Sequence, residues 1–506
     1  MKITCTVYYC PFTKGRQLGK SVAPLLENER EKPVFCKSFS NSVQNLFSMG
    51  ITTRPLRYFL LFFFAIVLLL PACKDDDEAG PSNENLVRNE DASVPVAWMK
   101  LYLELDRYAQ GFRPAPSPRA LAYINLAAYE SAMDGMPSYQ SLRVFYPGLQ
   151  IPQAERGRTY HWPTVLNAVY ATMLKRMVPG NILDAAQQSS LQFKLLTLEQ
   201  SFDDTFRARH GNQTYERSKK FGVDVANAFW EWSKTDAAGH EAFYNPRPAN
   251  YIAPTGPGFW QPTPPDFSAP LFPYWGSART FVISQTEQLA RPPLDYSENP
   301  FSLFYLQALE TKSNVDNLNL NNQWIAEFWS DDFTGTMLSP PARWISIALQ
   351  VVENENADLE TALYALAKVS IALNDAGVAC WFSKYIYNVE RPVSYIRRVI
   401  DPNWLPHWNT TPSFPAYPSG HATFGAAAAE ALSSVFGYNY SFVDRTHAFR
   451  TDFIGLPRTF DTFYQAAEEN AFSRILLGVH FRMDSEEGLR HGYQIGRRVN
   501  EMPFRK

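Results

Sequence analysis

Two long stretches of this chain, residues 342–354 and 359–387, are apolar over most of the surface that they would present as helices. Such patterns predict α-helices buried on nearly all sides, as in the centre of a helix bundle. No run of alternating polar and apolar residues persists elsewhere, so the predicted class is all-α. No internal repeat is evident either, which argues against a helical solenoid.

Shorter helical patterns lie on both sides of a proline-rich segment. They cover residues 98–105, 120–133, 162–177, 191–206, 215–234, 301–310 and 322–329. Residues 245–275 between them hold nine prolines, which makes regular structure improbable there. An extended segment of this length either wraps the surface or lines a site, and we expect it to wrap the surface.

The N-terminal part is expected to direct export. Residues 1–48 lack periodicity, and we take Met49 as the true start of the protein. Arg54 and Arg57 then precede an apolar run at residues 58–70, which ends in the sequence Leu-Pro-Ala-Cys73. This pattern predicts a lipoprotein signal peptide at residues 49–72 and lipidation of Cys73. An uncleaved membrane anchor is the alternative, although the run is short for a bilayer span.

An acidic tract, KDDDE, follows Cys73 at residues 74–78. It resembles the export signal of some Gram-negative surface lipoproteins, which predicts an outer-membrane lipoprotein at the cell surface or in the periplasm. Residues 73–93 are expected to form an acidic tether, and the folded body to begin near Val94. The only predicted membrane contact is therefore the lipid anchor.

The overall charge gives no reason to expect a polyanionic partner. The formal net charge is −3, so no nucleic acid is predicted to bind and any anion site must be local. Of the five cysteines, only Cys380 lies in the expected folded body, so no disulfide framework is available there. No pair of Cys or His shows zinc-ligand spacing next to a second pair.

Three motifs in the C-terminal part carry chemistry. In the first, Lys384 and Arg391 are seven positions apart, so we expect both cations to point the same way at the end of one helix. Pro392 disfavours continuing that helix past Arg391.

The second motif is Pro418-Ser419-Gly420-His421, which leads into an alanine-rich run ending at Phe436. This predicts a loop that ends in a helix N-terminus, where unpaired backbone N–H groups and the helix dipole favour an anion. Ser419 can cap that helix or donate to a bound oxygen.

The third motif holds Arg474, His480 and Asp484. The last two are four positions apart, so we expect them on one helix face, with Asp484 accepting a hydrogen bond from one ring nitrogen. The other nitrogen would then be a nucleophile or a ligand. Gly478 just before them allows a sharp entry into that helix.

In this order, the three motifs resemble the signature of the superfamily that joins vanadium-dependent haloperoxidases, type 2 phosphatidic acid phosphatases and bacterial acid phosphatases. The resemblance implies two packed helix bundles, at residues 94–300 and 301–506, the second one catalytic. It implies that His480 binds one vanadate per chain and that Asp484 orients His480. His421 would act as acid and base. The groups expected to neutralise the vanadate oxygens are Lys384, Arg391, Ser419, Gly420 through its N–H, and Arg474.

The haloperoxidase interpretation is favoured over the phosphatase one for three reasons. Lipid phosphatases of the superfamily usually span the membrane several times, and we expect no run after Cys73 to be long and apolar enough to span. The small acid phosphatases lack a large helical portion before the signature. Residues 113–129, 256–265 and 326–332 also look like segments of bacterial vanadium haloperoxidases.

Trp381 and Phe414 match the aromatic positions beside the vanadate in haloperoxidases, where they would form the halide pocket. The predicted function is oxidation of halide, with iodide or bromide favoured, by hydrogen peroxide. The alternative is an acid or lipid phosphatase in which His480 forms a phosphohistidine. A non-catalytic glycan-binding surface lipoprotein is a third interpretation, but it leaves the three motifs unexplained. An oligomer is compatible with the sequence.

Overall fold

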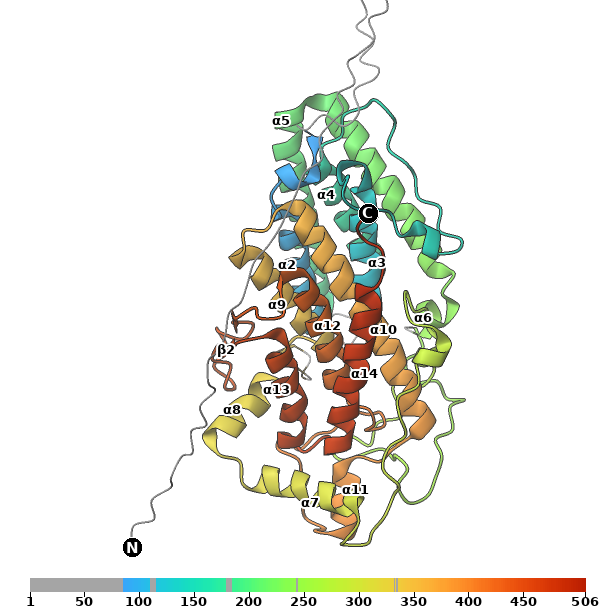
Figure 1. The fold of residues 1–506 in the computed structure, drawn as a ribbon, viewed down its shortest axis with the longest axis vertical. Coiled ribbons are helices and arrows are strands. Elements are labelled where there is room, and N and C mark those ends of the chain that lie inside the picture. The colour runs from blue at the N-terminus through green and yellow to red at the C-terminus, as the bar shows by residue number, and fades with distance from the viewer. Residues whose placement is uncertain (1–84, 110–114, 179–183, 243, 332, 334) are drawn as a thin grey trace, which may run out of the picture. The chain divides into compact units, whose positions relative to one another are not determined.

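The computed structural model describes residues 85–109, 115–178, 184–242, 244–331, 333 and 335–506 (Figure 1). The predicted start at Met49, signal peptide, lipidation site Cys73 and most of the tether lie outside the described residues. At the N-terminal edge of the described part, Val87 is fully buried and the Leu359 N–H donates to the Glu90 carbonyl over 2.8 Å. The folded body therefore begins before Val94, and the prediction that the tether extends to residue 93 is wrong.

The first half of the fold is helical, as predicted. Its helices are α2 (Ser93–Tyr108), α3 (Pro116–Ser131), α4 (Trp162–Met177), α5 (Ala185–Lys234) and α6 (Ala237–Ala242). The predicted helices at 191–206 and 215–234 are the two parts of α5, which is broken at Gly211, a residue with φ of 70°. Glycine adopts this backbone conformation without steric cost, which accounts for the break.

The second half contains the two long helices predicted from the apolar stretches. Its helices are α7 (Leu303–Asp316), α8 (Leu320–Phe328), α9 (Pro340–Asn354), α10 (Leu359–Tyr387), α11 (Pro392–Val399), α12 (Gly420–Phe436), α13 (Phe463–Leu476) and α14 (Arg482–Asn500). Short 3₁₀ turns are η2 (Val87–Asn89), η3 (Met133–Gly135), η4 (Arg143–Phe145), η6 (Trp275–Ser277) and η7 (Gln285–Glu287).

One small antiparallel hairpin, β1 (Phe442–Asp444) with β2 (Arg458–Phe460), was not predicted. Its register places Phe442 opposite Phe460. Strands of three residues are too short to produce a recognisable alternation, and the all-α class is confirmed.

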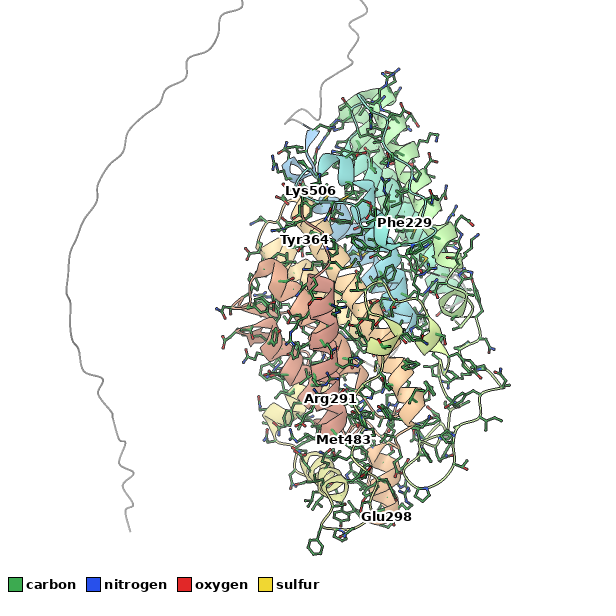
Figure 2. All side chains as sticks on the ribbon, turned by 45° about the vertical axis from the view of Figure 1, so that its right-hand side comes forward. Phe229, Arg291, Glu298, Tyr364, Met483 and Lys506 are labelled. Atoms are coloured by element: carbon green, nitrogen blue, oxygen red, sulfur yellow. The ribbon has the colours of Figure 1, made fainter. Side chains whose placement is uncertain are left out.

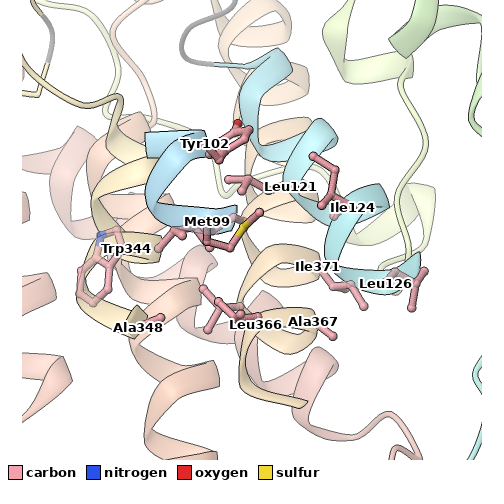
Figure 3. Packing of buried hydrophobic residues seen from close by; sticks show 14 of the residues in the cluster. Met99, Tyr102, Leu121, Ile124, Leu126, Trp344, Ala348, Leu366, Ala367 and Ile371 are labelled. Carbon is pink, nitrogen blue, oxygen red and sulfur yellow. The ribbon is translucent and has the colours of Figure 1, made fainter. Parts of the chain in front are cut away.

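Helix α10 lies at the centre of the described fold and contacts both α3 and α12. Figure 3 shows side chains of three other helices meeting those of α10: Met99 and Tyr102 of α2, Leu121, Ile124 and Leu126 of α3, Trp344 and Ala348 of α9, and Leu366, Ala367 and Ile371 of α10 itself. The core thus crosses the predicted boundary at residue 300, and the boundary itself stays a prediction.

By length and composition alone, α10 could cross a membrane. The expectation that no run after Cys73 is long and apolar enough to span a membrane is therefore wrong. The apolar window of this helix is wholly buried inside the protein, however, which is typical of the core helix of a bundle.

Helices α12 and α14 pack very closely because α14 carries three glycines spaced four positions apart, Gly488, Gly492 and Gly496. A Cβ at Gly488 would lie 2.8 Å from the Ser419 carbonyl oxygen, and one at Gly492 would lie 2.3 Å from that of Thr423. These distances are too short for any side chain. The glycines therefore bring the backbone of α14 against the start of α12.

The segments that connect the helices are bonded to α14 and to the end of α10. Arg291 lies beside α14, and its backbone N–H donates to Glu487 Oε1 over 2.7 Å (Figure 2). The proline-rich segment lies across the end of α10, where the Trp260 N–H donates to the Asn388 carbonyl over 2.7 Å. The Leu271 N–H likewise donates to the Ser413 carbonyl over 2.9 Å.

Candidate active site

The first motif lies at the end of α10, but not on one helix as predicted. Lys384 occupies the last turn, and Asn388 ends the helix with φ of 49° and ψ of 37°, the left-handed conformation. Arg391 follows in an extended conformation as the N-cap of α11. The left-handed turn therefore brings the two cations together, and the expectation of a helix running to Arg391 is wrong.

Lys384 is fully buried, and its ammonium group donates to three backbone carbonyls. The acceptors are the oxygens of Pro415, Ala416 and Pro418, at 2.9, 2.9 and 2.6 Å from Nζ. An ammonium group has three N–H bonds, so all three are used in holding the loop that leads to Ser419.

The second motif forms the predicted helix N-terminus. Ser419 is the N-cap of α12, and its side chain accepts a long hydrogen bond, 3.5 Å, from the Ala422 N–H. Gly420 and His421 begin the helix, so their N–H groups and the positive end of the helix dipole face the loop. The Ser419 N–H donates to the Asp484 carbonyl over 2.8 Å, which ties the second motif to the third.

Two buried guanidinium groups complete the positive charge. Arg391 Nε donates to the Phe414 carbonyl over 3.0 Å, and its Nη1 lies 3.1 Å from His480 Nε2. Arg474 extends from the last turn of α13, where its Nη1 donates to the Trp329 carbonyl over 3.0 Å. These contacts hold both planar groups in fixed orientations.

The third motif differs from the prediction in one respect. His480 precedes α14 rather than lying on it, and Phe481 is the N-cap. Asp484, in the first turn, reaches back so that its Oδ2 accepts from the Phe481 N–H at 3.0 Å and from His480 Nδ1 at 2.9 Å. The predicted pairing is confirmed, but through a helix cap instead of one helix face. Gly478 has φ of 78°, as a sharp entry requires.

Burial and the concentration of cations govern the ionisation of these groups. Burial lowers the pKa of Lys384 to about 7 and raises the pKa of Asp484 to about 7. The pKa of His480 is held well below its usual range by burial and then by Arg391, Lys384 and Arg474. His480 is therefore neutral at pH 7, and the nitrogen that faces Arg391 is unprotonated.

A small pocket opens onto these motifs. Its walls include Trp381, Phe414, Gly420, His421, Arg474 and His480, all predicted from the sequence. Lys384 and Arg391 are buried against its Phe414 ring, Ser419 is buried next to Gly420, and Asp484 is buried beside His480. Pro340, Pro412 and Phe424 also line it and were not predicted. Phe424 lies four positions after Gly420 and so one turn further along α12, a signal that the sequence did contain.

Aromatic rings face the cations at one side of the pocket. The ring centroids of Trp381 and Phe414 are 5.0 Å apart, and Phe414 lies 5.2 Å from Lys384 Nζ and 5.1 Å from Arg391 Cζ. These rings exclude water from the cations without neutralising them. The fold and the site thus define an all-α protein with a buried, positively charged site for a small oxyanion.

Comparisons with known proteins agree with this class. A protein-family model described as the VCPO second helical-bundle domain matches residues 364–505, which contain all three motifs. Vanadium chloroperoxidase of Curvularia inaequalis is 25% identical over 483 residues, covering 77% of this chain and 78% of its own.

Solved structures extend the similarity. The structure described as the first bacterial vanadium-dependent iodoperoxidase has a TM-score of 0.70 and 29% identity, over 81% of this chain and 97% of that one. A holo-type bacterial vanadium-dependent chloroperoxidase shares the fold, with a TM-score of 0.57 and 16% identity over 84% and 96% of the two chains. The chain is thus similar to vanadium-dependent haloperoxidases in sequence and in fold over about four fifths of its length.

The residues present fit vanadate. The pocket offers cationic donors from Arg391 and Arg474, backbone N–H groups at the start of α12, and the unprotonated His480 Nε2. Within the described ranges, no three His, Cys, Asp or Glu side chains gather as ligands for a metal cation. The donor set therefore suits a metal that enters as an oxyanion.

Proposed function

We propose that this protein is a vanadate-dependent haloperoxidase, which oxidises halide with hydrogen peroxide to hypohalous acid. The single observation that carries the proposal is a pocket lined by Arg474, His480 and the start of α12, with Lys384 and Arg391 buried against its Phe414 ring. In the net reaction, hydrogen peroxide, halide and one proton give hypohalous acid and water. One vanadate per chain, when bound, would supply the Lewis acid that activates hydrogen peroxide.

The protein's own groups hold the oxyanion and manage the proton. His480 Nε2 would be the single protein ligand to vanadium, because Asp484 keeps the ring proton on Nδ1. The Ser419 hydroxyl, the Gly420 N–H and the guanidinium groups of Arg391 and Arg474 would hold the oxygens, and the buried ammonium group of Lys384 would add positive charge beside them. His421, which lines the pocket, would give and take the proton that the net reaction consumes.

Trp381 and Phe414 would form the halide pocket, and iodide or bromide is the expected substrate. Both rings are almost fully buried beside the cations, which leaves an apolar recess with positive potential. Among the halides considered, iodide is the most easily oxidised, so its oxidation requires the least activation by the site.

One observation favours phosphatase chemistry as a second candidate. An unprotonated His480 Nε2 next to three cations could attack the phosphorus of a bound phosphate ester and form a phosphohistidine. His421 would then protonate the leaving oxygen.

The deciding experiment assays one purified sample, with and without vanadate, for peroxide-dependent iodide and bromide oxidation and for cleavage of p-nitrophenyl phosphate. Vanadate-dependent halide oxidation is expected. Its absence, together with rapid phosphate-ester cleavage, would replace the haloperoxidase proposal with the phosphatase one. His480→Ala should abolish either activity.

We also propose that the protein is an outer-membrane lipoprotein anchored through Cys73 after removal of residues 49–72. The sequence pattern around Cys73 supports this, as does the acidic tract after it. Labelling cells with an alkyne fatty acid should mark the wild-type protein and leave Cys73→Ser unlabelled. Protease treatment of whole cells distinguishes the surface from the periplasm.

A further inference from the structure

Residues 388–390, between Lys384 and Arg391, are held on both sides by backbone hydrogen bonds. On one side, the Trp260 N–H donates to the Asn388 carbonyl over 2.7 Å, and the Glu390 N–H donates to the Gly258 carbonyl over 2.9 Å. Phe259 and Val389 form an antiparallel bridge between these two bonds. The proline-rich segment therefore adds a short strand to the segment that joins the two site cations.

On the other side lies the loop that leads to Ser419. The Ala416 N–H donates to the Val389 carbonyl over 2.9 Å. Lys384 and Arg391 bind carbonyls of the same loop, including those of Ala416 and Phe414. Three stretches of backbone thus lie side by side, with the connection between the two cations in the middle.

Asn388 is the residue on which this arrangement depends. It is not glycine, yet it adopts the left-handed conformation, which asparagine tolerates better than most residues but still at a cost. Its side chain holds it there. Oδ1 accepts from the Tyr251 hydroxyl over 3.0 Å, and Nδ2 donates to the Tyr385 carbonyl.

We infer that Tyr251, in the proline-rich segment, is a positioning residue for the oxyanion site, acting through Asn388 on the relative placement of Lys384 and Arg391. This inference rests on the proposed function. Tyr251 is not among the residues that line the pocket. Its hydroxyl favours the turn that brings both cations to one anion, so its loss allows conformations in which the two cations separate. The apparent affinity for the oxyanion then falls in proportion to the fraction of molecules that keep the left-handed turn at Asn388.

The test compares Tyr251→Phe with wild type by calorimetric titration with vanadate and, separately, with inorganic phosphate. A neutral hydrogen bond contributes about 1 kcal/mol, so up to about fivefold weaker binding of both anions is expected. Tyr274→Phe is the matched control, because Tyr274 packs against the Tyr251 ring at 6.1 Å and has no bond to Asn388 in the described contacts. Tyr274→Phe should bind both anions like wild type.

Two substitutions of Asn388 separate positioning from general stability. Asn388→Gly keeps the left-handed turn accessible, whereas Asn388→Ala disfavours it, so anion binding should weaken more in Asn388→Ala. The melting temperature without anion, measured alongside, reports any purely structural loss. Unchanged anion binding by Tyr251→Phe would overturn the inference alone. Wild-type protein that binds neither anion would overturn the inference together with the proposed function.

Discussion

Arg391 Nη1 lies 3.1 Å from His480 Nε2, and this contact fixes which tautomer the imidazole adopts. A guanidinium group can only donate, so His480 Nε2 must be the acceptor. The ring proton therefore resides on Nδ1, which donates to Asp484 Oδ2 over 2.9 Å. The lone pair of His480 Nε2 thus accepts from Arg391, which a bound oxyanion would have to displace, while the other ring nitrogen is held by a buried carboxylate.

Removing that carboxylate should weaken oxyanion binding. We expect Asp484→Ala to bind vanadate about 10- to 100-fold more weakly, because the ring loses the carboxylate that holds its Nδ1–H and its orientation. Isothermal titration with vanadate measures the change. Glu486→Gln, on an exposed position of the same helix, is the control and should bind normally. If the two variants bound vanadate alike, the role assigned to Asp484 would be wrong.

Oxyanion affinity should also depend on pH through Lys384, whose pKa burial lowers to about 7 in the site without an anion. A bound oxyanion favours the charged ammonium group and so raises this pKa. Below pH 7, Lys384 carries its proton before and after binding, so it adds no pH dependence. Above pH 7, binding must take up a proton, so the affinity falls as pH rises, by up to about tenfold per pH unit.

The control for this pH dependence is Lys384→Arg, because a guanidinium group stays charged throughout the range. Titrations with tungstate from about pH 6 to about pH 9 should give a steeper loss of affinity for wild type than for Lys384→Arg. The titrations of the anion and of Asp484 are common to both proteins, so they largely cancel in the difference. Parallel curves for the two proteins would rule out deprotonation of Lys384 as the cause.

The sequence predicted much of this site because its chemistry is concentrated in three short motifs. Apolar spacing alone also predicted the first and last residues of α4 and α10 correctly. The geometry that joins the motifs did not follow. The spacing of Lys384 and Arg391 fits two turns of helix, and only the backbone shows that Asn388 ends the helix between them.

A similar ambiguity concerns His480 and Asp484. Four positions apart, they could share a helix face or lie on either side of a helix start, and both arrangements let the carboxylate reach the ring. Helix α14 was harder still to predict, because it is rich in charged residues and carries three buried glycines. Periodicity does not show that such a helix is pressed against an alanine-rich partner.

That contact gives a prediction about stability. In Gly492→Ala, the new Cβ would lie 2.3 Å from the Thr423 carbonyl oxygen, so α12 and α14 must move apart. We expect a loss of about 1–3 kcal/mol in the free energy of unfolding, measured with urea. Oxyanion binding should weaken as well, because the same two helices carry Ser419 and Asp484. Gln494→Ala, on the exposed side of α14, should leave both quantities nearly unchanged.

A third buried arginine, Arg343, supports Arg474 from outside the pocket. Arg343 is fully buried, and its Nε donates to Asp444 Oδ2 over 2.9 Å. Its Nη2 donates to the Phe328 carbonyl over 2.8 Å, next to the Trp329 carbonyl that accepts from Arg474. Arg343 therefore holds the backbone turn that orients Arg474.

Replacing Arg343 by methionine should cost about 3–5 kcal/mol in the free energy of unfolding, because the Asp444 carboxylate stays buried without its cation. Arg445→Met is the matched control: Arg445 follows β1 directly but is exposed, so its loss should cost little. Arg343→Lys keeps the charge but not the forked geometry, so it should recover part of the stability while vanadate still binds more weakly than to wild type. Equal unfolding free energies for Arg343→Met and Arg445→Met would show that the buried ion pair does not stabilise the turn.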